Sequence, residues 1–369
     1  MLFIELSLIA LVAAILPLYI FYKKYRNSSI DYKFLYFTLL LCFLTFDLII
    51  FGAFTRLTDS GLGCPDWPGC FASSNPFSAI NHITLAYEKM PTGAVSKLKA
   101  WIEMTHRYFA MVIGILAIIL NYIAFRYKNS IQIKPIYSLA ILALIIIQGI
   151  FGAFTVTLKL QPIIVTIHLI LAIILLCSLV MLFTKQLNII NKVQTYVIQG
   201  NSRILTFLSL FLLAIQIVLG AWVSSNYAVL GCNEFPSCIN GEYLPKADFY
   251  QGFSIWRDLG FNKNGDILSF ASLTAIHLVH RYMAIVVFFI FLINLITLIR
   301  KLNLPNINFQ TQKVIKLSKI LIVILTLQVF TGIANVVLDW PILSALIHTG
   351  GAAYMISGLI YILSLKREA

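Results

Sequence analysis

Long apolar segments constrain this chain more than any other feature of its sequence. Nine runs of about 20 mostly hydrophobic residues, the length that crosses roughly 30 Å of hydrocarbon, can be marked: 2–22, 34–54, 101–125, 136–157, 162–184, 203–224, 272–298, 316–338 and 341–364. Hydrophobic residues make up 60% of the chain and charged residues only 11%, unlike a soluble domain. The sequence therefore predicts an all-α integral membrane protein.

Basic residues fall in alternate loops between these segments. They gather in five stretches: 23–33, 126–134, 185–203, 300–319 and 366–367. By the positive-inside rule these loops are cytoplasmic, which explains the net charge of +13 without nucleic-acid binding. The long loops 56–100 and 225–271 then face the external, periplasmic side of the cell inner (plasma) membrane. The first segment, with Glu5 near its start, is expected to be an uncleaved N-out helix.

The chain contains an internal repeat. FGAFTRLTDSGLGCPDWPGC at 51–70 aligns without gaps with LGAWVSSNYAVLGCNEFPSC at 219–238. EMTHRYFAMVIGI at 103–115 then aligns with HLVHRYMAIVVFF at 277–289. A parallel repeat of this kind predicts two tandem, pseudo-symmetric four-helix bundles, an eight-helix core, preceded by one extra transmembrane helix.

The repeat divides the chain into three predicted domains. Residues 1–33 hold the extra helix and a basic cytoplasmic loop, 34–190 form the N-terminal four-helix unit, and 191–369 form the C-terminal unit. A further match relates the segment around Gly152 to the segment around Gly332, at a shift of 180 residues. Both halves begin on the same side of the membrane under this division.

Four histidines occupy corresponding positions in the two halves. Each half has one on its second helix and one on its fourth, at matching depth: His106 and His168, then His280 and His348. Two imidazoles that face each other across a four-helix bundle make a bis-histidine axial site for heme iron. Hydrogen-bonded packing is one alternative, and a zinc or copper cluster, which needs three or four ligands, is another. We assign no role to His82, in the first external loop.

The two halves differ one turn away from these histidines. Glu103 lies three residues before His106, hence on the same helix face, whereas His277 takes the corresponding place in the second half. A carboxylate beside one heme and an imidazole beside the other suggests that one site does chemistry while its twin is structural or transfers electrons. The alternative is that Glu103 complements the helix dipole or pairs with Arg107.

Three arginines sit near the same external boundary of the spans. They are Arg56, Arg107 and Arg281. A guanidinium group matches the carboxylates of heme propionates in charge and geometry, so these side chains are candidate cofactor-binding residues. Simple positioning at the membrane interface is the alternative.

The motifs together resemble the heme A synthase family, bacterial and mitochondrial membrane proteins that oxidise a methyl group of heme O to the formyl group of heme A. The resemblance runs through GAFTRLTDSGLGCPDWPGC, EMTHR, TIHL, HLVHRY and ALIHTGG, across nearly all of 34–364. It implies an oxidoreductase of heme biosynthesis and cytochrome c oxidase assembly. The helix at 2–22 lies outside the eight-helix core of that family.

The resemblance also implies roles for particular residues. His106 and His168 would be axial iron ligands where the substrate heme O reacts to heme A, and His280 and His348 would hold a heme b cofactor. Glu103 would be the catalytic acidic residue. Candidate partners besides the lipid bilayer are the farnesyltransferase that makes heme O, an electron acceptor and a second copy of the chain.

The family branch that this chain resembles carries cysteine pairs in its external loops. Here they are Cys64–Cys70 and Cys232–Cys238, expected to be disulfides because the external space is oxidising. Each short closed loop would shape the mouth of its bundle. A redox role for the cysteines is the alternative.

Three other functions compete with the synthase. A membrane disulfide oxidoreductase would use the external cysteine pairs but would leave four paired histidines idle. A di-heme b-type protein that only transfers electrons accounts for the histidines equally well, and only Glu103 and the family resemblance favour the synthase over it. A transporter with a parallel repeat would need a polar cavity at the membrane midplane.

Overall fold

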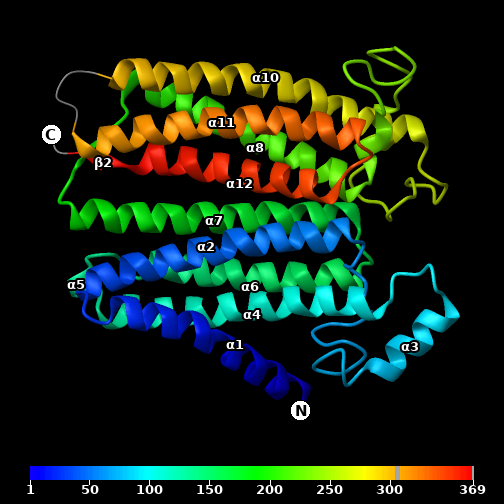
Figure 1. The fold of residues 1–369 in the computed structure, drawn as a ribbon, viewed down its shortest axis with the longest axis horizontal. Helices are drawn as coiled ribbons and strands as arrows, with labels where there is room; N and C mark the ends of the chain where they lie inside the picture. Colours follow the sequence, from blue (N-terminus) through cyan, green and yellow to red (C-terminus); the bar gives the residue numbers. More distant parts are fainter. Residues whose placement is uncertain (304–307, 368–369) are drawn as a thin grey trace. The chain divides into compact units, whose positions relative to one another are not determined.

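The computed structural model of the chain describes residues 1–303 and 308–367 (Figure 1). Within these ranges the regular secondary structure is almost all helical. Its helices are α1 (Leu2–Tyr25), α2 (Ile30–Leu57), α3 (Ile80–Lys89), α4 (Lys97–Arg126), α5 (Lys128–Ile131), α6 (Ile136–Thr157), α7 (Pro162–Ile190), α8 (Gly200–Ser225), the 3-10 helix η1 (Ala228–Gly231), α9 (Phe249–Gly252), α10 (Phe270–Leu302), α11 (Phe309–Val337) and α12 (Ile342–Ser364). Two short strands, β1 (Thr195–Tyr196) and β2 (Lys366–Arg367), pair antiparallel with Thr195 opposite Arg367.

Nine helices in the described part of the chain are long and apolar enough to cross a membrane: α1, α2, α4, α6, α7, α8, α10, α11 and α12. They coincide with the nine predicted apolar runs, so the prediction of an all-α, multi-pass membrane protein is confirmed. Several are longer than predicted. Helix α10, for example, has 33 residues and continues through Arg300 and Lys301, because a helix can extend beyond the hydrocarbon into the polar interface.

Serine caps fix where the two histidine–arginine helices begin. The Ser96 hydroxyl accepts a hydrogen bond from the Lys99 backbone N–H at 3.2 Å at the start of α4. Ser269 does the same for Ser272 at 3.3 Å at the start of α10. Such caps satisfy backbone donors that the first helical turn leaves without a partner.

Packing divides the chain into two compact units. Unit 1 comprises Met1–Leu160 and Leu171–Ile190, and unit 2 comprises Gln161–Ile170 and Asn191–Ala369. The beginning of α7, which carries His168, thus groups with unit 2, although the repeat assigns it to the first half of the chain. Helix α1 groups with unit 1.

Unit 2 contains a closed ring of four helices. Helix α10 packs against α8 and α11, and α12 packs against α11 and α8. These four helices run side by side in Figure 1. Helices α10 and α12 are therefore the diagonal pair across the bundle, which is the arrangement that two facing imidazoles require.

Helix α4 is the centre of unit 1. It packs against α1, α2 and α6. Helix α1 buries Leu6, Ala10 and Ala14, which lie four residues apart and so share one face. The small alanines allow close helix approach, while most of the rest of α1 is exposed, as expected for lipid contact.

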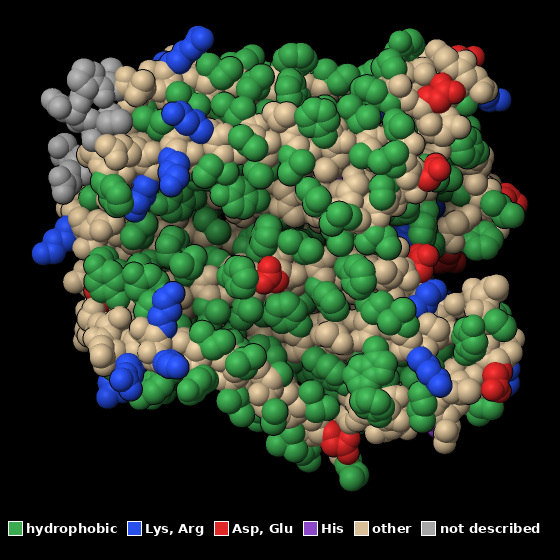
Figure 2. All heavy atoms as spheres, in the orientation of Figure 1, with side chains coloured by type: hydrophobic (Ala, Val, Ile, Leu, Met, Phe, Trp, Pro, Cys, Tyr) green, Lys and Arg blue, Asp and Glu red, His purple; other side chains and the backbone are tan. Residues whose placement is uncertain are grey.

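Apolar and basic side chains are separated on the surface of each unit. Figure 2 shows hydrophobic side chains along the helices, with most of the visible Lys and Arg at the end of unit 1 that carries α5 and the end of unit 2 that carries β2, and fewer at the opposite ends. These ends hold loops that the sequence predicts to be cytoplasmic. The long cysteine loops lie at the opposite end of the helices in each unit.

Enlarging Ala14 should weaken the packing of α1 on α4. Ala14→Leu places a larger side chain in a buried contact, so we expect a loss of about 1–3 kcal/mol of stability, measured as a lower thermal unfolding midpoint in detergent. Ala13→Leu is the matched control, because Ala13 is exposed. Equal midpoints for the two variants would contradict this packing.

Candidate functional site

The two histidines of unit 2 lie on the diagonal helices, His280 on α10 and His348 on α12. Glycines face both rings: a Cβ placed on Gly220 would lie 3.0 Å from His280 Cε1, and one on Gly332 would lie 3.4 Å from His348 Cε1. Glycine at these positions keeps space open beside each imidazole.

Polar side chains contact both of these imidazoles. Gln216 Nε2 lies 3.1 Å from His280 Nδ1, closer than the 3.4 Å to Nε2, and also donates to the His280 carbonyl oxygen at 3.1 Å. Thr331 Oγ1 lies 2.9 Å from His348 Nδ1. A contact at Nδ1 orients the ring, as polar neighbours of metal-binding histidines commonly do.

His106 of unit 1 has similar neighbours. It lies on α4, and its ring stacks on Phe51 with centroids 5.9 Å apart. A Cβ placed on Gly52, the repeat counterpart of Gly220, would lie 3.1 Å from His106 Cε1. The glycine-to-histidine contact is therefore duplicated, and the sequence carries its signal in the aligned FGA and LGA segments.

The polar supports of unit 2 are not duplicated in the sequence. At the repeat shifts of 168 and 180 residues, the counterparts of Gln216 and Thr331 are Leu48 and Phe151. Neither apolar side chain can hydrogen-bond an imidazole. The two halves thus differ around their histidines as well as at Glu103, a difference that the sequence analysis missed.

His168 lies near the beginning of α7, in the segment that groups with unit 2. Two residues earlier, the Thr166 and Ser225 hydroxyls are hydrogen-bonded at 3.0 Å, which ties α7 to the end of α8. The pairing of His106 with His168 stays a prediction, because these residues belong to different units.

Both predicted disulfides, Cys64–Cys70 and Cys232–Cys238, are confirmed. All four cysteines are fully buried. Leu2 and Leu6 of α1 pack in the cluster around the first pair, and Leu278 of α10 packs on the second. Cysteines covered in this way fit a structural role better than a redox role, because thiol–disulfide exchange requires access to a sulfur.

An acidic residue between the two cysteines of each disulfide loop accepts hydrogen bonds from the backbone just after the second cysteine. The Asp66 carboxylate accepts hydrogen bonds from the Phe71 and Ala72 backbone N–H groups, both at 2.6 Å. Its counterpart Glu234 accepts from Asn240 at 3.1 Å and Gly241 at 3.0 Å. All four donor residues have positive φ, so consecutive N–H groups form a concavity that favours an anion.

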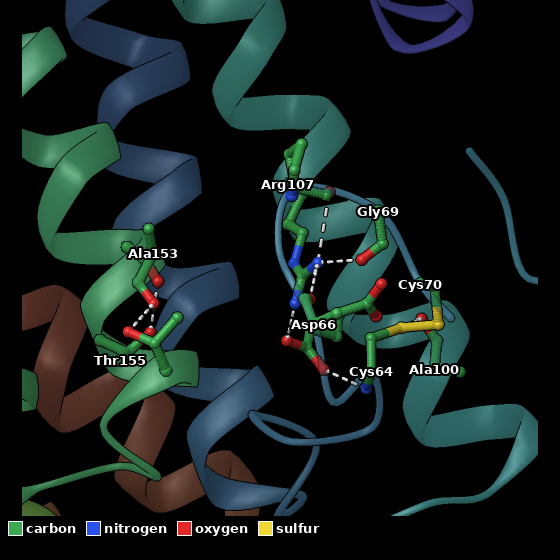
Figure 3. A network of polar contacts seen from close by, with 12 residues as sticks. Cys64, Asp66, Gly69, Cys70, Ala100, Arg107, Ala153 and Thr155 are labelled. Carbon is green, nitrogen blue, oxygen red and sulfur yellow. Dashed lines mark hydrogen bonds and ion pairs between the residues drawn. A yellow bond between two sulfur atoms is a disulfide. The ribbon is translucent and has the colours of Figure 1, made fainter. Parts of the chain in front are cut away.

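An arginine anchors each loop to the helix beneath it. Arg107 Nη1 donates to the carbonyl oxygens of Asp66 at 2.9 Å, of Pro68 at 3.2 Å and of Gly69 (Figure 3). Arg281 donates to Ser237 O at 2.7 Å and Glu234 O at 2.9 Å. These contacts to loop carbonyls were not predicted from the sequence. Binding of heme propionates by the two arginines stays a prediction.

Glu103 and His277 occupy equivalent positions with different chemistry. Glu103 is buried; one carboxylate oxygen forms an ion pair with Arg107 and the other accepts the Cys64 backbone N–H at 2.7 Å. In unit 2, His277 Nδ1 accepts the Cys232 backbone N–H at 3.3 Å. Pairing of Glu103 with Arg107, one of the two alternatives given above, is therefore confirmed.

The remaining predicted residues lie at the edges of this arrangement. Arg56, at the end of α2, forms an ion pair with the exposed Asp59 at 3.5 Å. His82 lies in the short helix α3, not in an irregular loop, and its ring stacks on Phe71 with centroids 6.0 Å apart. Across residues 1–303 and 308–367, no three His, Cys, Asp or Glu side chains converge as a metal site.

Fold and contacts together define a class: a multi-pass helical membrane protein whose duplicated histidine-bearing helices end beneath disulfide-closed loops. A family model described as cytochrome oxidase assembly protein matches residues 35–360. The heme A synthase of Shewanella oneidensis is 34% identical over 317 residues, 85% of this chain and 91% of that protein. The heme A synthase of Orientia tsutsugamushi (strain Ikeda) is 27% identical, over 85% of this chain and 91% of that protein. The heme A synthase of Wolbachia from Brugia malayi is 26% identical, over 89% of this chain and 96% of that protein. The chain belongs to the heme A synthase family.

Acid should loosen the second disulfide loop through Glu234. Hydrogen bonds from the Gly241 backbone and the Ser237 hydroxyl lower the pKa of Glu234. Their stabilising effect is therefore present above the ordinary carboxyl pKa and is lost as pH falls through the lowered value. We expect the hydrogen-exchange protection factor of the Gly241 amide to fall several-fold on acidification.

The variant Glu234→Gln tests the cause of this loss. It should show weak protection of Gly241 already at neutral pH, because a neutral amide is a poorer acceptor than a carboxylate. Glu242→Gln, an exposed neighbour in the same loop, should behave like the unaltered protein. A protection factor of the unaltered protein that does not change with pH would contradict the assignment.

Proposed function

We propose that this chain is a heme A synthase, which oxidises a methyl group of heme O to the formyl group of heme A. The relatives reported above carry that name. The observation that carries the proposal is the pair His280 and His348, on diagonal helices of one bundle, each facing a glycine that keeps its ring clear. The duplicated glycine contact at His106 extends the same design to the first half of the chain.

We assign a heme b cofactor to unit 2. The residues present fit such a group: two buried imidazoles as axial ligands, Gly220 and Gly332 beside them, and Nδ1 contacts that orient both rings. When bound, the heme would supply a reversible one-electron centre. The residues of the chain would hold that centre in place, because the two imidazoles come from diagonal helices of one bundle and polar neighbours orient both rings.

Heme O is assigned to the first half, with His106 and His168 as its axial ligands. Glu103 is the residue that distinguishes this half, because it places a carboxylate one helical turn from His106. We assign it to proton handling during methyl oxidation. Arg107 and the Cys64 N–H hold its two oxygens, so the position of the carboxylate is fixed before substrate binds.

The three arginines remain candidates for contacts to heme propionates. Arg107 and Arg281 each carry five N–H donors, and the loop carbonyls leave some of these donors for a further acceptor. Arg56 lies at the end of α2 beside Asp59. In this proposal Arg107 and Arg281 would each donate hydrogen bonds both to the carbonyls of a disulfide loop and to a heme propionate. The position of the loop would then affect heme binding.

The setting follows from the orientation of the helices. We place the protein in the inner (plasma) membrane with both disulfide loops on the external side, because the basic loops lie at the other end of each unit. The farnesyltransferase that makes heme O, an electron acceptor and a second copy of the chain are the partners we propose.

Extraction of the bound hemes tests the assignment directly. Protein purified from cells that make heme O should yield heme b together with heme O, heme A or a hydroxylated intermediate, identified by chromatography and mass. His280→Ala should lower the heme b content while the first-half heme is kept. Heme b alone would favour the di-heme electron-transfer protein, and absence of heme would favour a disulfide oxidoreductase.

The exchange Glu103→His separates chemistry from loop positioning. A histidine at this position copies His277 of unit 2, which accepts the equivalent cysteine N–H. We expect this variant to keep its hemes and its fold but to lose heme A formation, or to stop at an intermediate, measured by the same extraction. The reciprocal control, His277→Glu, should keep heme A formation. Normal product from Glu103→His would show that only the hydrogen bond to Cys64 matters.

A further inference from the structure

Unit 2 contains a buried arginine without a counter-ion. Arg257, in the loop between α9 and α10, is only 3% exposed. Its guanidinium donates to Phe261 O at 3.2 Å and to Asn226 Oδ1, and it lies against the ring of Trp222. Within residues 1–303 and 308–367 no carboxylate forms an ion pair with it.

This arrangement leaves a positive charge and several donors unsatisfied. A guanidinium has five N–H donors, of which the two bonds to Phe261 and Asn226 use two, and the Arg257 Nε has no acceptor. A buried charge without a partner is strongly destabilising, and proteins normally pair such a group with an opposite charge. The missing partner of Arg257 is therefore expected to come from outside the chain.

A cavity lies beside Arg257. Its volume is about 440 Å³, and its walls include Gln161, Lys263 and the aromatic rings of Trp256 and Phe261. Gln161 is buried and immediately precedes the N-terminus of α7, which favours an anion. One carboxylate, Asp258, also lines the cavity, but it is exposed and does not pair with Arg257.

The cavity lies at the level where membrane-spanning helices end. Helix α8 ends at Ser225, one residue before Asn226, and α7 begins at Pro162, one residue after Gln161. Trp256 and Phe261 are 66% and 44% exposed, and large aromatic side chains at this level are typical of the lipid headgroup region. Phospholipid headgroups are the most abundant anions at this depth.

We infer that this cavity binds a phosphate group through Arg257 and Lys263, with the headgroup of an acidic phospholipid as one source and free phosphate as the other. Arg257 provides the buried fork of donors, and Lys263 provides an exposed second cation at the rim. The first half of the chain has no equivalent, because the repeat alignment breaks in this part of the longer second loop. No histidine lines the cavity, and the proposal does not depend on the proposed heme chemistry.

Thermal unfolding of the purified full-length protein in detergent tests this site and its source. We expect short-chain phosphatidylglycerol to raise the unfolding midpoint, and phosphatidylcholine at the same concentration to do so far less. A rise with inorganic phosphate alone, equal to that with phosphatidylglycerol, would identify a free anion as the ligand. No rise with either compound would overturn the proposal.

Three variants assign the effect to the cavity. Arg257→Gln should raise the phosphatidylglycerol concentration needed for half of the effect at least about tenfold. Lys263→Gln, an exposed substitution that should not disturb folding, should raise it about threefold and keeps the test available if the first variant does not fold. Lys246→Gln, an exposed lysine of the same loop outside the cavity, should behave like the unaltered protein. Identical titrations for all three variants would contradict the site.

Discussion

The bond from a helix arginine to the carbonyls of a disulfide loop is the interaction on which the rest of each unit depends. A loop without regular structure must find partners for its backbone groups, and Arg107 and Arg281 supply several at once. Each arginine directly follows a histidine in the chain. These bonds fix the position of the loop relative to the helix that carries the histidine. The residue one helical turn before that histidine, Glu103 or His277, accepts a hydrogen bond from the backbone N–H of the first cysteine.

Duplication has preserved this scaffold and changed what it carries. Both units keep the disulfide, the acidic residue inside the loop, the arginine and the glycine that faces the histidine. One difference is that Glu103 of the first half corresponds to His277 of the second. The other is that Gln216 and Thr331, which contact histidines in unit 2, have apolar counterparts in the first half. The two halves thus share one scaffold but differ in the side chains at the positions around their histidines.

The sequence predicted the elements well because their signals are local or repeated. Apolar length fixed the nine spans, and the repeat identified the cysteine pairs and the four histidines. It could not predict that Arg107 reaches loop carbonyls, because a guanidinium group can donate to a backbone carbonyl as well as to a carboxylate. Nor could it place Arg257, whose burial depends on how a long irregular loop folds back against α8. The contacts of a side chain with an irregular loop depend on how that loop folds, and no periodic pattern in the sequence predicts them.

The first helix has a consequence for the order in which the protein matures. Leu2 and Leu6 of α1 pack in the cluster around Cys64 and Cys70, which have no exposed surface. Thiol oxidation needs access to a sulfur, so the bond must form before the groups that bury it, α1 among them, pack against the loop. Helix α1 precedes the loop in the chain and is therefore made before the cysteines that it helps to cover. Its docking against the loop is thus a step that follows oxidation, after α1 has already entered the bilayer.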